Sequence, residues 1–483
     1  MPGILNQRTS KWFERWFLLI TGLFIVANSL LIWQGIFYFS ALPLVVLILL
    51  AALFALDKLV YFIVFFVPFS LTLEFSEYAA LSVPSEPLLF GVLLIFIFRI
   101  VYAGGFDRQV TRHPITVLIL LYLAWMVITS LTSTMPMVSL KYTLARIWFM
   151  VSFYFIATQV FRSAKNIRFW IWLFTVPLSI VIIYSIVQFF NYNIDKNALY
   201  WVMQPFFKDH TIYGAVIAMM LPVMIVFSFD KSYLPKYRLI SGAFFIIIFA
   251  GIVVSYTRAA WLSIVAAWGV YLLFRYRISW KLILAAFVLG MVLLFQYQHE
   301  IMLRIGQNRQ SSSKDLAEHL QSVSNIRNDA SNLERINRWS SAIRMFKDKP
   351  VLGFGPGTYR FQYAPYQRSY EQTYVSTNSG SLGNAHSEYL GPLSEMGFPG
   401  LLLFLLIIAY TIYCASRVYN ANRGKPNGYL VIGILMGLMT YFFHGILNNF
   451  LDQDKAALPF WSMIAMIVAL DVYHRHPAQE KQV

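Results

Sequence analysis

Apolar runs alternate with short polar stretches along most of this chain. A helix needs about 20 mostly apolar residues to cross a membrane, and the runs that meet or approach this length are 17–37, 41–56, 59–73, 87–103, 114–132, 144–161, 168–190, 212–228, 237–255, 258–274, 279–297, 399–416, 428–449 and 457–473. Two of them, 41–56 and 59–73, are short and also fit re-entrant or fused segments. The pattern predicts an all-α polytopic membrane protein with about 12–14 transmembrane helices.

One long polar stretch, residues 298–398, interrupts this pattern. It divides the chain into a transmembrane bundle (1–297), a loop domain (298–398) and C-terminal transmembrane helices with a short tail (399–483). A loop of this length without a function is uncommon. Inside it, apolar residues recur at helical spacing between basic ones and predict an amphipathic helix that packs on the bundle or lies at the membrane surface: Leu333, Ile336, Trp339, Ile343 and Phe346.

Lysine and arginine set the orientation, because short loops rich in them stay in the cytoplasm. With the N-terminus inside, 21 of the 38 basic residues fall in inner loops and tails, and six fall in the opposite short loops. Both termini are therefore predicted to be cytoplasmic and the 298–398 loop to lie on the outer side of the membrane. Arg258 then begins a span at the outer surface, where the helix dipole adds to its positive charge.

Composition agrees with a membrane protein: 58% of the residues are hydrophobic, 12% are charged, and the mean hydropathy is +0.61. The net charge of +16 is explained by inner loops facing anionic lipid, so a nucleic-acid partner is set aside. The first apolar run follows "RTSKWFERW" and has no small-residue cleavage site, which predicts an anchor rather than a removed signal. The single cysteine, Cys414, excludes internal disulfides.

Two motifs that suggest cofactors are excluded. "GFGPGTYRF" (353–361) is glycine-rich, but it follows a helix in an all-helical context, whereas a dinucleotide-binding loop follows a strand; a turn that returns the chain to the membrane is expected instead. The eight histidines are dispersed and form no cluster with metal-ligand spacing. "STNSGSLGNA" (376–385) is expected to be a mobile lid.

The stretch "NAHSEYLGPLSEMGFPG" (384–400) places a histidine just before an apolar run. His386 and Ser387 are followed by nine residues, then Gly397, two residues and Gly400. Two further stretches accompany it, "SYTRAAWLS" around Arg258 and "RINRWSSAIRMFKDKPVLGFGPG" in the loop. Together these motifs resemble the O-antigen ligase superfamily, over roughly residues 205–450.

The resemblance implies transfer of a glycan from undecaprenyl diphosphate to an acceptor hydroxyl, at the periplasmic face of the bacterial inner membrane, with no cofactor and no essential metal. An imidazole can accept a proton near neutral pH, which makes His386 the candidate general base. Arg258, Arg146 and Arg338 are the candidate diphosphate contacts, and Ser387, Gly397 and Gly400 support the motif. For His210, helix capping is as good an interpretation as catalysis. For His444, a buried, hydrogen-bonded imidazole is the simpler interpretation.

The sequence is compatible with several functions. The same carrier-linked donor serves a ligase with a lipid A core acceptor, a polysaccharide polymerase and a protein O-oligosaccharyltransferase, and the motif order together with the single large loop favours the ligase. A monomer would suffice. A lipid-linked glycan transporter is the non-enzyme alternative. It is disfavoured because a transporter is expected to carry charged residues in mid-span, and these spans are nearly free of them.

Overall fold

The computed structural model describes residues 7–35, 38–43, 46, 55–76, 79–276, 330–369, 371–372, 376 and 383–474. The chain divides into two compact units, Met1–Leu59 and Val60–Val483. The first unit holds α1 (Gln7–Trp33), a long apolar helix with mostly exposed side chains. The three-part division expected from hydropathy, with boundaries at 297 and 398, stays a prediction.

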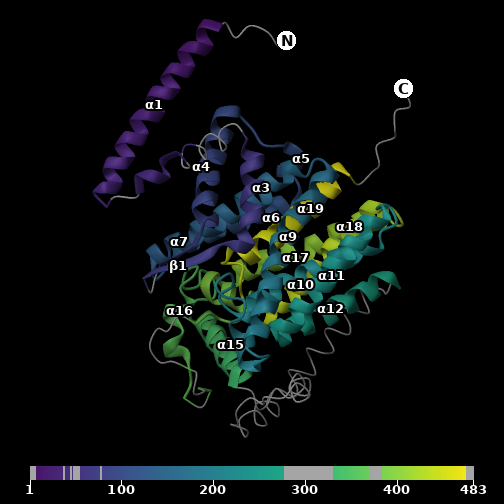
Figure 1. The fold of residues 1–483 in the computed structure, drawn as a ribbon. Helices are drawn as coiled ribbons and strands as arrows, with labels where there is room; N and C mark the ends of the chain where they lie inside the picture. The colour runs from purple at the N-terminus through teal and green to yellow at the C-terminus, as the bar shows by residue number, and fades with distance from the viewer. Residues whose placement is uncertain are drawn as a thin grey trace. The chain divides into compact units, whose positions relative to one another are not determined.

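Helices dominate the rest of the chain (Figure 1). From Leu56 onward the elements are α3 (Leu56–Phe66), β1 (Leu71–Ser76), β2 (Ala79–Val83), α4 (Ser85–Ala103), α5 (Arg108–Thr111), α6 (Pro114–Leu131), α7 (Pro136–Met150), α8 (Ala157–Val160), α9 (Ala164–Asn191), α10 (His210–Phe229), α11 (Pro235–Ser255), α12 (Arg258–Arg275), α15 (Ala330–Asp348), α16 (Tyr359–Gln362), α17 (Leu390–Ala421), α18 (Pro426–Leu447) and α19 (Asp454–Tyr473). A π-helical turn, Val151–Ile156, joins α7 to α8.

The all-α polytopic class is confirmed. Within the described residues, ten helices are long and apolar enough to cross a membrane, and the apolar part of α12, Arg258–Leu273, is slightly shorter. The predicted span 144–161 forms one continuous helical segment, Pro136–Val160, through the π-helical turn. The expected span 279–297 and most of 41–56 lie outside the described residues.

The expected span 59–73 differs from the structure. Helix α3 ends at Phe66, a 3₁₀ turn follows at Val67–Phe69, and the chain then enters the antiparallel hairpin of β1 and β2, with Leu71 opposite Val83. Proline at position 68 lies in that turn. From Leu71 the sequence "LTLEFS" alternates apolar and polar residues, which is the period of a strand and not of a helix.

The centre of the second unit is built from α10, α18 and α19, whose residues are among the most buried of the spans. Helix α18 packs against α10, α12, α17 and α19. Two of its glycines allow the close approach to α10. A side chain at Gly437 would collide with the Met219 carbonyl oxygen, 2.4 Å away, and one at Gly433 would meet Val226 at 3.0 Å. Small residues at such spacing let membrane helices pack with their backbones close together.

Helix α15 confirms the predicted helix in the polar loop, but its buried face is unexpected. Glu334, Asn337, Arg338 and Ser341 are buried, whereas Ile343 is exposed. The polar side is buried because it is hydrogen-bonded to the segments that follow it in the chain. Helix α15 also packs on α17, and Figure 1 shows it near α16 at one end of the helices.

Helix α17 is interrupted at Gly397, which has φ 67° and ψ −170°. This conformation divides it into a short first part beginning at Leu390 and a long apolar part from Phe398. A side chain on Gly397 would meet the Val351 carbonyl oxygen at 2.1 Å, so glycine is required both by the backbone angle and by the space. The kink separates the His386 segment from the membrane-spanning part of α17.

Candidate active site

His386 lies four residues before α17 in a strained backbone conformation, with φ +47°. Its N–H donates to Asn384 Oδ1 at 3.1 Å, and its carbonyl oxygen accepts from Trp339 Nε1 of α15 at 3.2 Å. A non-glycine residue is held in the left-handed region only when its surroundings fix it, and such residues concentrate at functional sites. Hydrogen bonds to Asn384 and Trp339 therefore hold the backbone of His386 in this conformation.

The imidazole of His386 is largely enclosed by protein. Burial and then the positive charges of Arg335 and Arg338 lower its pKa from 6.5 to about 4, although Glu334 acts in the opposite direction. The ring is therefore neutral at pH 7 and has a lone pair that can accept a proton. It is a weaker base than a free imidazole, because burial and then the nearby arginines disfavour the imidazolium.

Asn448, just after α18, connects two histidines. Its Nδ2 lies 3.1 Å from Nε2 of His444, and its side chain is also a hydrogen-bond partner of the His386 ring, which raises the His386 pKa against the effect of burial. An amide that donates to one ring through Nδ2 can accept from the other through Oδ1. In that arrangement the second nitrogen of His386 keeps its lone pair.

Arg258 and Arg335 lie near enough to each other for the charge of Arg258 to lower the pKa of Arg335. Arg258 is the first residue of α12, whose first N–H groups have no intrahelical acceptor. Arg335 of α15 donates from Nε to the Leu447 carbonyl oxygen at 3.3 Å. Burial and then the charge of Arg258 lower the pKa of Arg335 to about 10. Arg258 at the N-terminus of α12, together with the charge of Arg335 that it acts on, makes a site that favours an anion.

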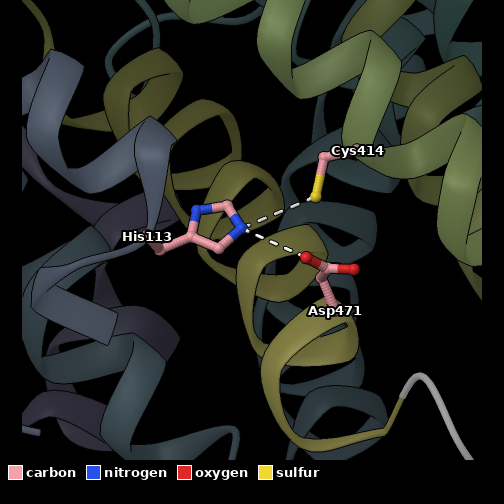
Figure 2. Close-up of side chains that lie close together, drawn as sticks. All are labelled: His113, Cys414 and Asp471. Carbon is pink, nitrogen blue, oxygen red and sulfur yellow. Dashed lines mark hydrogen bonds and ion pairs between the residues drawn. The ribbon is translucent and has the colours of Figure 1, made fainter. Parts of the chain in front are cut away.

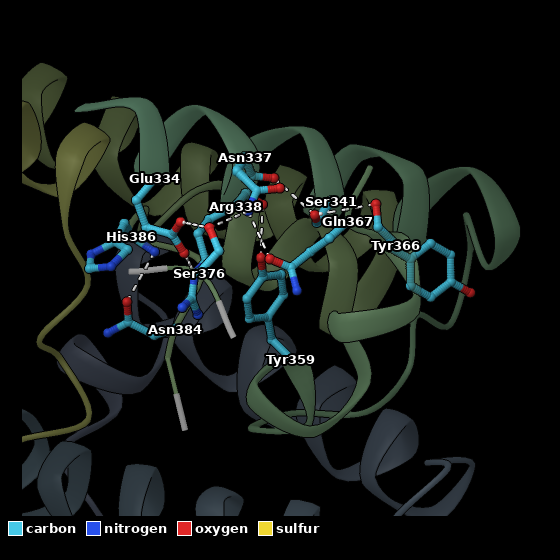
Figure 3. A network of polar contacts seen from close by, with 10 residues as sticks. All are labelled: Glu334, Asn337, Arg338, Ser341, Tyr359, Tyr366, Gln367, Ser376, Asn384 and His386. Atoms are coloured by element: carbon cyan, nitrogen blue, oxygen red, sulfur yellow. Dashed lines mark hydrogen bonds and ion pairs between the residues drawn. The ribbon is translucent and has the colours of Figure 1, made fainter. Parts of the chain in front are cut away.

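Arg338, one turn further along α15, has a different environment. Its Nε donates to Glu334 at 2.7 Å, and its guanidinium lies over the Tyr363 ring, 4.3 Å from the centroid. Figure 3 shows Arg338 beside Glu334, which is also bonded to Ser376, in a network that extends to Asn337 and Gln367. The charge of Arg338 is thus balanced by the buried carboxylate of Glu334. Through Glu334, Arg338 is part of the network that joins α15 to later residues of the loop.

Arg146, the third predicted diphosphate contact, is 7% exposed and lies over the ring of Tyr142 in its own helix. Its positive charge acts on the carboxylates of Glu388 and Asp452. The side chain of Asp452 is exposed, whereas Glu388 is buried. The charge of Arg146 is therefore used within the protein, on two acidic residues.

Glu388 was not singled out from the sequence, although it stands two positions after His386. Its Oε1 accepts from the Tyr441 hydroxyl at 2.8 Å and from the backbone N–H groups of Phe450 and Leu451 at 2.7 and 2.8 Å. Burial raises the pKa of Glu388, and Arg146 lowers it. This carboxylate holds the segment after α18 against the segment that carries His386.

The remaining motif residues shape the backbone. Ser387 Oγ accepts from the N–H groups of Tyr389 and Leu390, both at 3.3 Å, as a capping side chain does. Gly397 forms the kink described above. Gly400 lies against Met396, so that a side chain there would meet Met396 Cβ at 2.4 Å.

The glycine-rich run 353–357 wraps around the first part of α17. Gly353, Gly355 and Gly357 have positive φ angles. The N–H groups of Phe354 and Gly355 donate to the carbonyl oxygens of Ser394 and Glu395 at 3.1 and 2.8 Å. These donors are used within the protein, which agrees with a structural turn. The lid expected at 376–385 lies mostly outside the described residues.

Among the described residues, one group has the composition of a metal site: His113, Cys414 and Asp471, from the start of α6, α17 and α19 (Figure 2). His113 Nδ1 accepts from the Ile115 N–H at 3.3 Å, so a neutral ring carries its proton on Nε2, which faces Asp471 at 3.3 Å. Asp471 also pairs with Arg417. A metal on Nε2 would displace that proton, so these groups fit a hydrogen-bonded cluster better than a metal centre.

Comparison with known proteins identifies the region around this site. Residues 243–405 match the family model described as O-antigen ligase. The matched region includes Arg258, Arg335, Arg338 and His386, and it confirms the resemblance to the O-antigen ligase superfamily. No curated protein matches the chain.

Proposed function

We propose that the protein transfers O-antigen polysaccharide from undecaprenyl diphosphate to the lipid A core oligosaccharide. The match of residues 243–405 to the O-antigen ligase family model supports an activity of the glycosyltransferase ligase or polymerase type. The reaction takes place at the periplasmic face of the bacterial inner membrane, with both termini in the cytoplasm and without a metal or cofactor. The observation that supports this proposal is that the charge of Arg335 acts on the neutral His386 imidazole and the charge of Arg258 acts on Arg335.

In the proposed reaction, His386 takes the proton of the acceptor hydroxyl as the oxygen attacks the anomeric carbon of the glycan. The bond from that carbon to the diphosphate oxygen breaks, and undecaprenyl diphosphate leaves with the negative charge. Arg258, Arg335 and the N-terminus of α12 stabilise this charge as it develops. Asn448 orients the imidazole.

Arg338 and Arg146 stay in the proposal as the diphosphate contacts predicted from the sequence, with a weaker part than Arg258. Arg338 pairs with Glu334, and the charge of Arg146 acts on Glu388 and Asp452. Their charge is partly neutralised, so a bound diphosphate gains less from them.

The test is a reconstituted assay with purified protein and a carrier-linked glycan donor. Three acceptors are offered separately: lipid A core, a second carrier-linked repeat, and a serine-containing peptide. Product on lipid A core supports the ligase. Product on the second repeat or on the peptide would assign the protein instead to the polymerases or to the protein O-oligosaccharyltransferases, and movement of donor across vesicles without transfer would assign it to the transporters.

In the same assay, Arg258→Ala is expected to abolish transfer and leave the melting temperature in detergent unchanged. Arg258→Lys is expected to restore part of the activity, because a single ammonium cannot reproduce a bidentate phosphate contact. Full activity of Arg258→Ala would remove this residue from the mechanism.

A further inference from the structure

Residues 350–352 connect α15 to the glycine-rich turn and expose an apolar surface. Val351 is 58% exposed and Leu352 is 38% exposed. Residues 350–352 lie against the kink of α17, because the Phe398 N–H donates to the Pro350 carbonyl oxygen at 2.8 Å and Gly397 contacts the carbonyl of Val351. Its apolar side chains are therefore presented at the point where the long apolar part of α17 begins.

That part of α17 carries a continuous exposed apolar stripe. Phe398, Leu402, Leu405 and Leu406 are between 40% and 55% exposed, and their spacing places them on one face of the helix. Helix α17 is one of the candidate membrane spans, and exposed apolar residues on a span face lipid. The stripe starts at Phe398, next to the 350–352 turn.

The two lysines that precede residues 350–352 have the chemistry of a membrane interface. Lys347 and Lys349 are exposed, and Lys349 Nζ lies 4.7 Å from the centroid of the Phe354 ring. Lysines at the edge of an apolar surface extend their amines toward phosphate groups while their methylene chains stay on apolar neighbours. A water-facing loop would gain nothing from two adjacent exposed aliphatic side chains, whereas acyl chains would cover them.

We propose that Val351 and Leu352, together with Phe398, insert into the lipid leaflet at the end of the bundle that carries His386, with Lys347 and Lys349 at the phosphate level. The loop domain is then anchored to the bilayer at the C-terminal end of α15. Since α15 also carries Arg335, this anchor sets the height of the cationic site above the acyl chains.

The test uses single-cysteine labelling, for which the chain is suited because its one cysteine, Cys414, is buried. Val351→Cys, in the full-length protein with Cys414→Ala, is labelled with an environment-sensitive fluorophore and reconstituted into phosphatidylethanolamine and phosphatidylglycerol vesicles. Part of the lipid is replaced by phosphatidylcholine with brominated acyl chains. Ser369→Cys, at an exposed position of the same loop, is the matched control.

The expected result is loss of fluorescence at position 351 with brominated lipid and little loss with aqueous iodide, with the opposite result at position 369. Quenching of position 351 by iodide and not by brominated lipid would overturn the proposal. Shielding from both quenchers would also overturn it, because a second copy or another protein would then cover the turn. Leu352→Cys is a second labelling site in case Val351→Cys does not fold.

Discussion

The charge of Arg258, at the start of α12, acts on Arg335 of the loop helix α15, so two distant parts of the chain bring their arginines within electrostatic reach of each other. Burial and the charge of Arg258 lower the pKa of Arg335 to about 10. Both arginines remain cationic at neutral pH, so their mutual repulsion is retained in the resting protein. A diphosphate bound between them would relieve it, which gives the pair a physical preference for an anion.

The first prediction compares Arg335 with Arg338 in the same helix. Arg335→Ala is expected to lower the turnover number by about 10²–10³, the usual cost of removing one group that stabilises developing charge, with little change in melting temperature. Arg338→Ala removes the cation that pairs with the buried Glu334 and is expected to lower the melting temperature. Turnover and detergent melting curves measured on both variants check this, and a stable, inactive Arg338→Ala would reverse the assignment.

The second prediction concerns His386 itself. His386→Ala and His386→Gln are both expected to lose about 10²–10⁴ of the rate, as for a missing general base, while still binding the donor. Gln retains a hydrogen-bonding side chain without the basicity, so it separates chemistry from structure. An active, stable His386→Gln protein would end the base hypothesis.

The third prediction is the pH profile. From the sequence alone, the rate should fall as pH drops through about 6.5, but in the structure burial and the neighbouring arginines lower the pKa of His386 to about 4. The neutral, active form therefore persists to lower pH, and the acid limb of kcat/KM is expected near pH 4. The unfolded chain binds a proton to this histidine below about 6.5, so stability is expected to decrease as pH falls from there toward 4.

Controls for the pH profile come from Asn448. Its hydrogen bond raises the pKa of His386, so Asn448→Ala is expected to slow the reaction and to move the acid limb to lower pH. Asn449→Ala, at the next position, is the matched control and should leave the limb in place. An unchanged limb in Asn448→Ala would show that Asn448 does not act on the imidazole.

The fourth prediction tests the kink of α17. Gly397→Ala introduces a methyl group where the Val351 carbonyl oxygen lies 2.1 Å away and forces a side chain into the left-handed region. The expected cost is roughly 1–3 kcal/mol of stability, seen as a lower melting temperature. Gly269→Ala, in α12 where a methyl group would meet nothing within 4 Å, should be neutral, and equal melting temperatures for the two variants would contradict the steric explanation.

The fifth prediction is that transfer survives metal removal. The arginines are expected to take the place of a cation opposite the diphosphate, and the His113 group fits hydrogen bonds better than a metal. Purified protein treated with excess EDTA before addition of donor and acceptor should keep its full rate. Complete loss that magnesium restores would show that the positive side chains are not sufficient.

The helical class could be predicted from the sequence because hydrophobic length depends on local composition alone. The hairpin at 71–83 could not be predicted in the same way, because its first residues continue an apolar run. Residues 71–73 therefore fall within the predicted span 59–73, although their period is that of a strand. Arg258 at a helix start was predictable for the same local reason. In contrast, the neighbours of His386 come from α15 and from the segment after α18, and one sequence does not show which distant segments meet.

The sequence does not show which of Arg335 and Arg338 is better placed to bind the diphosphate. Both arginines stand in one predicted helix, three residues apart, and spacing gives no reason to prefer either. The difference arises from Glu334, which pairs with Arg338, and from the charge of Arg258, which acts on Arg335. Glu388 was equally hidden, because its partners, Phe450 and Leu451, lie more than 60 positions away.

The hydrogen bonds of Glu388 have a consequence for biosynthesis. The chain is made from its N-terminus, and Glu388 is inserted while Phe450 and Leu451 have not yet been synthesised. The carboxylate can reach its backbone partners only after α18 has crossed the membrane and the next segment has followed it. The surroundings of His386 are therefore completed late in membrane insertion, and a nascent protein that stops before residue 450 would carry every motif residue of the family yet lack an assembled site.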